Sequence, residues 1–118
     1  MKTIGIIGTR RRDSGQDLWD TVDAFKRVYR VGDRIVSGGC PQGGDRFAEV
    51  IARSMQIPIM IHYAQWNTYG KSAGFRRNAD IANDADIMLA VVAEDRTGGT
   101  EDTLKKFNLK LDPEVILI

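Results

Sequence analysis

Short apolar runs alternate along this chain with stretches in which apolar residues recur every three or four positions. Each run has the length of a buried strand, and each intervening stretch is typical of a helix. The predicted strands are residues 4–7, 34–37, 58–62, 86–92 and 115–118, and the predicted helices lie between Ser14 and Gly32, at 45–55, at 76–83 and after Thr100 to about Phe107. Such alternation gives parallel pairing through right-handed crossovers. We expect a single α/β domain over residues 1–118, with a Rossmann-like three-layer α/β/α fold and a mostly parallel five-stranded sheet in the order 3-2-1-4-5.

The segment 63–75 has neither strand nor helix spacing and is predicted to be a loop. It contains three aromatic residues, Trp66, Tyr69 and Phe75. We expect two of them to cover the edge of the core and the third to be free to stack on a base.

Charge and cysteine content narrow the class of protein. Lys and Arg total 17 and Asp and Glu total 16, so the net charge of +1 gives no overall attraction to nucleic acid or membranes. No apolar run approaches the ~18 residues that a membrane-spanning helix needs, and the first residues lack the features of a signal peptide. One cysteine and one histidine form neither a disulfide nor a Cys/His zinc site. We expect a cytoplasmic protein without a metal or cofactor.

Glycines cluster where the predicted strands end. They follow the first, second and fourth strands and are Gly8, Gly38, Gly39, Gly43, Gly44, Gly98 and Gly99. The carboxyl ends of parallel strands meet at one edge of the sheet, where ligands of such folds bind. A glycine-rich loop before a helix exposes backbone N–H groups at the positive end of the helix dipole, which suits phosphate. Basic residues gather in the same neighbourhood, so we expect a local anion site despite the near-zero net charge. They are Arg10, Arg11, Arg12, Arg46, Lys71, Arg76, Arg77 and Arg96.

The candidate ligand-binding residues come from these loops and from the neighbourhood of the paired arginines. They are Gly8, Thr9, Arg10, Ser37, Gly38, Gly39, Gly43, Gly44, Asp45, Lys71, Arg76, Arg77, Asn78, Gly98, Gly99 and Thr100. The N–H groups of one glycine loop or the other would hold a phosphate, the arginines would neutralise it, and Asp45 would orient a ribose. The alternatives are tight turns for the glycines and a helix cap for Asp45. The chain has neither the dinucleotide-binding fingerprint nor the P-loop pattern.

Two acids are the candidate catalytic residues. Glu101 and Asp102 lie in the first turn after Thr100, where acids also stabilise a helix through its dipole. Their carboxylates could stabilise an oxocarbenium-like transition state. We expect no catalytic role for His62 or Cys40, because neither has a partner in the sequence that would activate it.

Several motifs together resemble the YspA-like branch of the SLOG superfamily. They are Ser37-Gly38-Gly39 with Gly43-Gly44-Asp45, Trp66, Gly70-Lys71-Ser72-Ala73-Gly74-Phe75-Arg76-Arg77-Asn78, Ala85-Asp86 and Gly98-Gly99-Thr100, spread over residues 3–107. SLOG proteins form a Rossmann-like group that includes the DNA-processing protein DprA and the Lonely Guy phosphoribohydrolases. The resemblance implies a nucleotide or nucleotide-derived ligand. Of the Lonely Guy pattern Pro-Gly-Gly-x-Gly-Thr-x-x-Glu, this chain matches Gly99-Thr100 but has Thr103 at the position of the glutamate.

Three functions are compatible with these observations. The first is binding of a nucleotide-derived, phosphate-bearing small molecule, as a sensor or processing module. The second is hydrolysis of the N-glycosidic or phosphoribosyl bond of such a molecule. The third, by analogy with DprA, is binding of single-stranded DNA. We also expect a homo-oligomer, because the apolar run 115–118 would form an exposed edge strand in a monomer.

Overall fold

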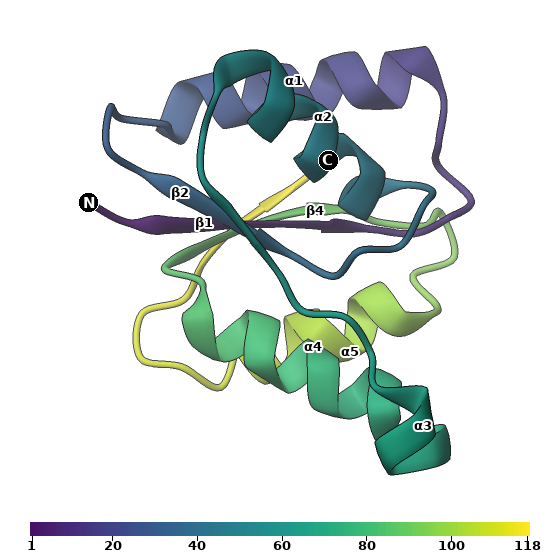
Figure 1. Cartoon of the computed structure of the whole chain (residues 1–118). Helices are drawn as coiled ribbons and strands as arrows, with labels where there is room; N and C mark the ends of the chain where they lie inside the picture. Colours follow the sequence, from purple (N-terminus) through teal and green to yellow (C-terminus); the bar gives the residue numbers. More distant parts are fainter.

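The computed structural model describes residues 1–118, and its five strands form one parallel sheet between two layers of helices (Figure 1). The strands are β1 (Thr3–Gly8), β2 (Arg34–Ser37), β3 (Ile59–Ile61), β4 (Ile87–Val91) and β5 (Glu114–Leu117). Their order is β3-β2-β1-β4-β5, and every pairing is parallel. The Rossmann-like fold and the strand order predicted from the sequence are confirmed.

The helices cover both faces of the sheet. Helices α1 (Gly15–Val28) and α2 (Gly44–Met55) lie on one face, and α4 (Ala73–Asp84) and α5 (Gly99–Phe107) lie on the other (Figure 1). Two short elements, α3 (Trp66–Tyr69) and a 3₁₀ turn at Gly70–Ser72, precede α4. None of the helices has both the length and the apolar character needed to cross a membrane.

The alternation of side chains along β1 divides the core into two parts. Ile6 points toward the α1–α2 layer and packs in the same cluster as Phe25, whereas Ile7 points the other way and packs in the same cluster as Phe107. Both phenylalanine side chains are fully buried. Each helical layer is therefore anchored by its own apolar cluster.

The predicted N-cap of α1 is confirmed. The hydroxyl of Ser14 accepts a hydrogen bond from the backbone N–H of Asp17, and the Asp17 carboxylate accepts one from the backbone N–H of Ser14. This capping box satisfies backbone donors that the first turn leaves without a partner.

The segment 63–75, predicted to be a loop, is partly helical. It contains α3 and the 3₁₀ turn, and α4 begins at Ala73 rather than at residue 76. A helix of one turn, such as α3, is too short to show a 3.6-residue repeat, which is why the spacing does not reveal it.

The expected burial of two aromatic residues in this segment is wrong. Trp66, Tyr69 and Phe75 are 58%, 45% and 59% exposed. The guanidinium of Arg76 lies 4.3 Å from the Tyr69 ring centre, and Lys106 Nζ lies 5.4 Å from that of Phe75. Tyr69 and Phe75 thus each have a cation–π partner at the protein surface, a contact that does not require the ring to be buried.

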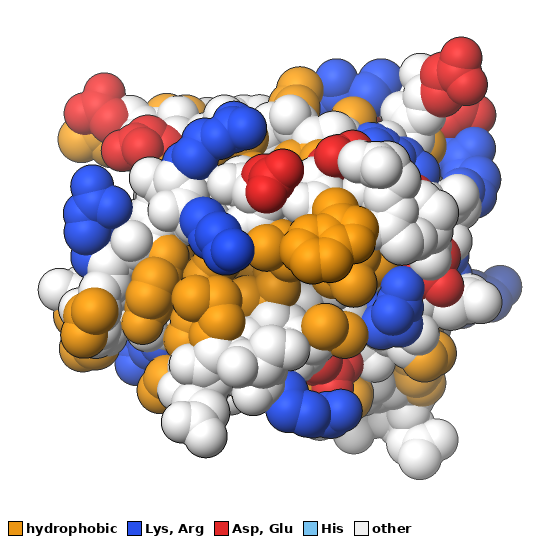
Figure 2. Space-filling model, turned by 90° about the horizontal axis from the view of Figure 1, so that it is seen from above, with side chains coloured by type: hydrophobic (Ala, Val, Ile, Leu, Met, Phe, Trp, Pro, Cys, Tyr) orange, Lys and Arg blue, Asp and Glu red, His pale blue; other side chains and the backbone are white.

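The outer face of the α1–α2 layer is mixed in character (Figure 2). Apolar side chains gather near its middle, and basic and acidic side chains are interspersed around them. Trp19 of α1 and Met55 of α2 are among the exposed apolar residues of these helices. Basic side chains on this face have acidic ones among them, so the face carries no concentrated positive charge that would attract an anion.

The first turn of α2 lies directly against the end of β1. A Cβ atom at Gly44 would lie 2.2 Å from the carbonyl carbon of Ile7 and 2.3 Å from the nitrogen of Gly8. Gly43 has a φ of +75°, and a Cβ there would lie 2.3 Å from the carbonyl oxygen of Thr9. The fold itself therefore requires glycine at both positions.

Substitution of Gly44 by alanine should destabilise the protein strongly, because the added methyl group has only backbone atoms to displace. We expect a loss of about 3 kcal/mol or more in the free energy of unfolding, measured by chemical denaturation. The control is Gly15→Ala at the start of α1, where a Cβ meets no atom within 4 Å, and where we expect a change of at most about 1 kcal/mol. Equal stability of the two variants would contradict this account of the contact.

Asp33 joins the residue before β1 to the turn before β2. It lies at the amino ends of the strands, whereas the glycine loops lie at their carboxyl ends. Its carboxylate accepts hydrogen bonds from the backbone N–H of Lys2 at 2.9 Å, from Lys2 Nζ at 2.5 Å and from the backbone N–H of Arg30 at 2.9 Å. Burial alone would raise the pKa of Asp33, but these hydrogen bonds outweigh it and lower the pKa to about 2.

The ionised Asp33 should stabilise the fold in a pH-dependent way. Its pKa is lower in the folded chain than its ordinary value of 3.8, so the stabilisation is complete above about pH 4 and is lost as the pH falls toward 2. We expect Asp33→Asn to lower the free energy of unfolding at neutral pH by about 2 kcal/mol, and to flatten its dependence on pH in that window. Denaturant titrations of both proteins between pH 2 and 7 test this, and parallel pH profiles would refute it.

Candidate anion-binding site

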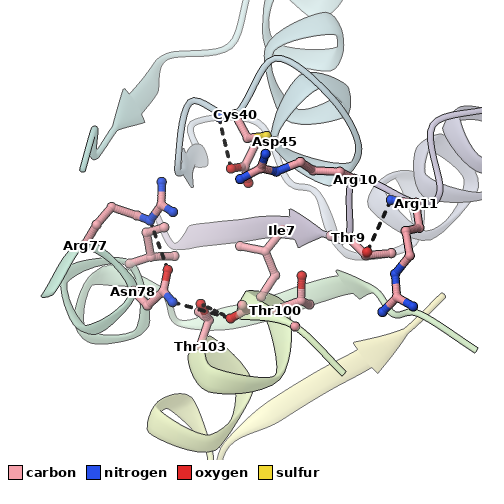
Figure 3. Close-up of a pocket in the computed structure, with 14 residues that line it drawn as sticks. Ile7, Thr9, Arg10, Arg11, Cys40, Asp45, Arg77, Asn78, Thr100 and Thr103 are labelled. Carbon is pink, nitrogen blue, oxygen red and sulfur yellow. Dashed lines mark hydrogen bonds between the residues drawn. The ribbon is translucent and has the colours of Figure 1, made fainter. Parts of the chain in front are cut away.

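A cavity of about 290 Å³ opens at the carboxyl ends of β1 and β4, the two strands between which the strand order reverses (Figure 3). Its lining comes from four parts of the chain. These are the end of β1 with the following loop (Ile7–Arg11), the β2–α2 region (Cys40 and Asp45), α4 (Arg77, Asn78 and Ile81) and the start of α5 (Gly98–Thr100 and Thr103). Parallel α/β sheets bind their ligands at this topological switch point.

The structure brings nine of the predicted ligand-binding residues together in the lining. They are Gly8, Thr9, Arg10, Asp45, Arg77, Asn78, Gly98, Gly99 and Thr100. Five others lie outside the lining, at the end of β2 (Ser37), in the segment that joins it to α2 (Gly38, Gly39 and Gly43) and at the first residue of α2 (Gly44). Lys71 and Arg76 are exposed and do not line the cavity.

Five lining residues are absent from the sequence prediction, namely Ile7, Arg11, Cys40, Ile81 and Thr103. Helix periodicity could have found two of them. Ile81 follows Arg77 by four residues and Thr103 follows Thr100 by three, so each shares a helix face with a predicted residue.

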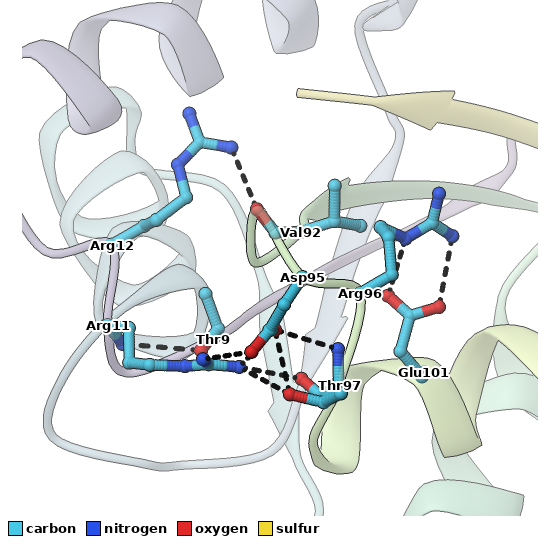
Figure 4. A network of polar contacts seen from close by, with 8 residues as sticks. All are labelled: Thr9, Arg11, Arg12, Val92, Asp95, Arg96, Thr97 and Glu101. Carbon is cyan, nitrogen blue, oxygen red and sulfur yellow. Dashed lines mark hydrogen bonds and ion pairs between the residues drawn. The ribbon is translucent and has the colours of Figure 1, made fainter.

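Most of the nearby arginines are already neutralised by carboxylates. Arg11 forms a two-pronged contact with Asp95, with both distances 3.0 Å, and it also donates to the carbonyl and hydroxyl of Thr97 (Figure 4). Hydrogen bonds from Arg11 and Thr97 lower the pKa of Asp95 to about 2, and the contact raises the pKa of Arg11. The contacts of Arg11 with Asp95 and Thr97 hold the β4–α5 loop against the β1–α1 loop.

Two arginines of the lining have no carboxylate within 4 Å, namely Arg10 and Arg77. In Figure 3 they reach toward the cavity from different elements, Arg10 from the β1–α1 loop and Arg77 from α4. The one acid in the lining is Asp45. The cavity is therefore cationic even though the whole chain is almost neutral.

Arg77 is held in place by two hydrogen bonds. Its Nη1 donates to the carbonyl oxygen of Gly38 at 2.7 Å, and its Nε donates to Asn78 Oδ1 at 2.9 Å. A Cβ at Gly38 would lie 2.9 Å from Arg77 Nη1 and 2.8 Å from Asp45 Oδ2, so glycine is what allows both side chains to approach. The amide of Asn78 in turn donates to Asp102 at 3.1 Å and to the carbonyl oxygen of Gly99 at 3.4 Å. Asn78 thus connects Arg77 to the start of α5.

The first turn of α5 has no capping side chain. Gly98 is the N-cap with a φ of +109°, and no side chain accepts a hydrogen bond from the first-turn N–H groups. Thr100 is 9% exposed and lines the cavity, and its hydroxyl makes no hydrogen bond within the protein. A Cβ at Gly99 would meet no atom within 4 Å, so packing does not explain a glycine there. This helix end offers donors at the cavity that the protein itself does not use.

The start of α2 differs, because an internal carboxylate already accepts the N–H of its N-cap residue, Gly43. Asp13 Oδ1 accepts a hydrogen bond from the Gly43 N–H at 2.7 Å and from Arg46 Nε at 2.8 Å. These bonds, that from Gly43 first, lower the pKa of Asp13. Of the two glycine loops that the sequence left as alternatives, only the loop before α5 presents its glycines to the cavity.

Asp45 lies in the first turn of α2, two residues beyond the capping position, which Gly43 occupies. It is 8% exposed, and its carboxyl group contacts Ser37 Oγ at 2.8 Å and the backbone N–H of Cys40 at 3.2 Å. Burial is the largest influence on the pKa of Asp45 and raises it, while the backbone N–H of Cys40 and the charge of Arg77 act in the opposite direction.

The two candidate catalytic acids lie outside the cavity. Glu101 forms a two-pronged ion pair with Arg96, at 2.8 and 3.0 Å, and Asp102 is held by Asn78 and by Lys106 Nζ at 2.5 Å. Glu101 is thus engaged away from the lining, whereas Asp102 supports the lining residue Asn78 from behind without itself facing the cavity.

Comparisons of the chain with models of protein families, with curated proteins and with solved structures found no match. The class that the fold and the site define is a Rossmann-like α/β domain with a cationic cavity at its topological switch point.

Proposed function

We propose that this protein binds a nucleotide-derived, phosphate-bearing small molecule, with the phosphate at the first turn of α5. One observation carries the proposal: two arginines without carboxylate partners face the same cavity as an uncapped helix N-terminus and the unpartnered hydroxyl of Thr100. Guanidinium groups, first-turn N–H groups and a hydroxyl are three different kinds of anion donor. Their convergence on one cavity is the reason to assign it to phosphate.

The size of the cavity limits the ligand. At about 290 Å³ it is at the small end of the range for ligand pockets, roughly 300–1,000 Å³. A single nucleotide or a fragment of one is a better match than a dinucleotide or a polymer. The apolar side chains of Ile7 and Ile81 in the lining would contact the part of the ligand that carries no charge.

The nucleotide character of the ligand is supported by the motif resemblance to the YspA-like SLOG proteins. Arg77, Asn78 and Gly98–Thr100, which belong to the motifs of that resemblance, all line the cavity. Hydrolysis by Glu101 or Asp102 gains no support, because neither carboxylate reaches the cavity.

The neighbouring arginines of α4 provide a matched test. Arg77 lines the cavity, whereas Arg76 lies over Tyr69 at the surface. We expect Arg77→Ala to weaken binding of adenosine monophosphate about tenfold or more, because a charge-assisted contact to phosphate is lost. We expect Arg76→Ala, which removes the same charge from the next residue, to bind as the wild type does. Isothermal titration calorimetry measures both.

Equal losses in the two variants would show that the charge acts from a distance rather than in the cavity. No binding of any nucleoside monophosphate by the wild-type protein at millimolar concentration would sink the proposal.

Substitution of Gly99 by alanine should weaken ligand binding and leave stability almost unchanged, whereas Gly44→Ala should destabilise the fold. Alanine at Gly99 meets no atom of the protein and occupies the first position of a helix, so the free energy of unfolding should change by no more than about 1 kcal/mol. The new methyl group would nevertheless stand where the phosphate approaches the N–H groups, and we expect at least about tenfold weaker binding. Denaturation and calorimetry on the same preparation separate the two effects. Unchanged affinity would place the phosphate elsewhere.

A further inference from the structure

The hydroxyl of Ser37 lies between two oxygen atoms that both normally accept hydrogen bonds. Ser37 Oγ is 2.5 Å from the carbonyl oxygen of Ile6 and 2.8 Å from Asp45 Oδ1. Ser37 and Ile6 are completely buried, and Asp45 is nearly so, which leaves no room for water to mediate either contact. A serine hydroxyl has a single hydrogen.

One hydrogen cannot occupy both contacts. A carbonyl oxygen carries no proton, so the Ser37 hydrogen must point to Ile6, because bare oxygens 2.5 Å apart would repel each other. The contact between Ser37 Oγ and Asp45 Oδ1 then needs a proton from Asp45 itself. The other carboxyl oxygen, Oδ2, accepts the backbone N–H of Cys40 at 3.2 Å, as the unprotonated oxygen of a carboxylic acid does.

The charged groups around Asp45 are few. Arg77 faces it from α4 and the lining also contains Arg10 from the β1–α1 loop, while the thiol of Cys40 is the other titratable group on this side. Neither arginine forms an ion pair with Asp45 within 4 Å, and Arg77 directs its Nη1 and Nε to Gly38 and Asn78. The burial of Asp45 raises its pKa and so acts in the same direction as the hydrogen-bond geometry.

We propose that Asp45 is a neutral carboxylic acid at neutral pH, and that its proton controls anion binding in the cavity. The proton on Oδ1 is donated to Ser37 Oγ, whose own hydrogen is donated to Ile6. When Asp45 loses this proton to solvent, one of the two contacts must open and a negative charge appears in the lining. The second half of the proposal rests on the proposed function, since it concerns the same anion.

The coupling has a defined sign. A carboxylate in the lining repels a phosphate, so the ligand prefers the protonated form of Asp45 and its affinity falls as the pH rises through the titration of Asp45. By linkage, phosphate binding makes Asp45 hold its proton more tightly.

The protonation state can be tested without a ligand. The ¹³C chemical shift of the Asp45 carboxyl carbon, followed by NMR across the pH range, should report a carboxylic acid at neutral pH. Asp45→Asn provides a second readout, because its amide can donate to Ser37 Oγ as the acid does. We expect the variant to equal the wild type in denaturant midpoint at neutral pH and to exceed it at high pH. A carboxylate shift at neutral pH, or a variant less stable than the wild type at every pH, would overturn the proposal.

The control of binding is tested with adenosine monophosphate and the same pair of proteins. The ligand phosphate titrates identically in both experiments, so the ratio of the two dissociation constants isolates Asp45. We expect a ratio near one while Asp45 is protonated, rising by up to about tenfold per pH unit above its titration as the wild type weakens. A ratio independent of pH would refute the coupling. If neither protein binds the nucleotide, the binding half falls with the proposed function, and the NMR titration alone decides the state of Asp45.

Discussion

The backbone contact between Gly44 and the end of β1 determines where the groups of the site lie. Because no side chain separates α2 from Ile7 and Gly8, the first turn of α2 lies against the end of β1. Asp45 is the next residue in that turn, which places its carboxyl group beside Ser37 at the end of β2. Gly38 then leaves space for Arg77 to approach from the opposite helical layer. A wider separation at Gly44 would move Asp45 away from Ser37 and from the cavity.

Ion pairing, rather than net charge, decides which cations remain available. Arg11, Arg12, Arg46 and Arg96 are each paired with a carboxylate, to Asp95, Asp17, Asp13 and Glu101 respectively. These pairs secure the loops around the sheet edge and neutralise most of its charge. Arg10 and Arg77 are the arginines of the lining that keep an uncompensated charge, and an acid that holds its proton would leave both effective. A composition of 17 basic and 16 acidic residues is therefore compatible with a site for an anion.

Local patterns were sufficient to predict the fold and much of the cavity. The Ser14 cap follows from the local residue pattern, and the meeting of Arg77 with Gly98–Thr100 follows from the rule that parallel strands end at one edge. The strand order follows from the usual arrangement of Rossmann-like folds rather than from particular residues. The sequence did not show which residues of α4 face the cavity, because the helix begins at Ala73, earlier than its pattern predicts. Adjacent helix residues point about 100° apart, so Arg77 lines the cavity and Arg76 does not. The hydrogen bond from the Gly43 N–H to Asp13, thirty residues earlier in the chain, has no local signature at all. Contacts of that kind depend on tertiary structure, as does the hydrogen bond from Asn78 to Asp102.

The most direct test of the account is an amide NMR titration of the wild-type protein with adenosine monophosphate. If the phosphate binds at the start of α5, the largest chemical-shift changes should occur at the backbone N–H groups of Gly98, Gly99 and Thr100 and at Arg77 Nε. The N–H of Gly43, which already donates to Asp13, should change little. Changes centred on Gly43 and Gly44, or none at the start of α5, would contradict it.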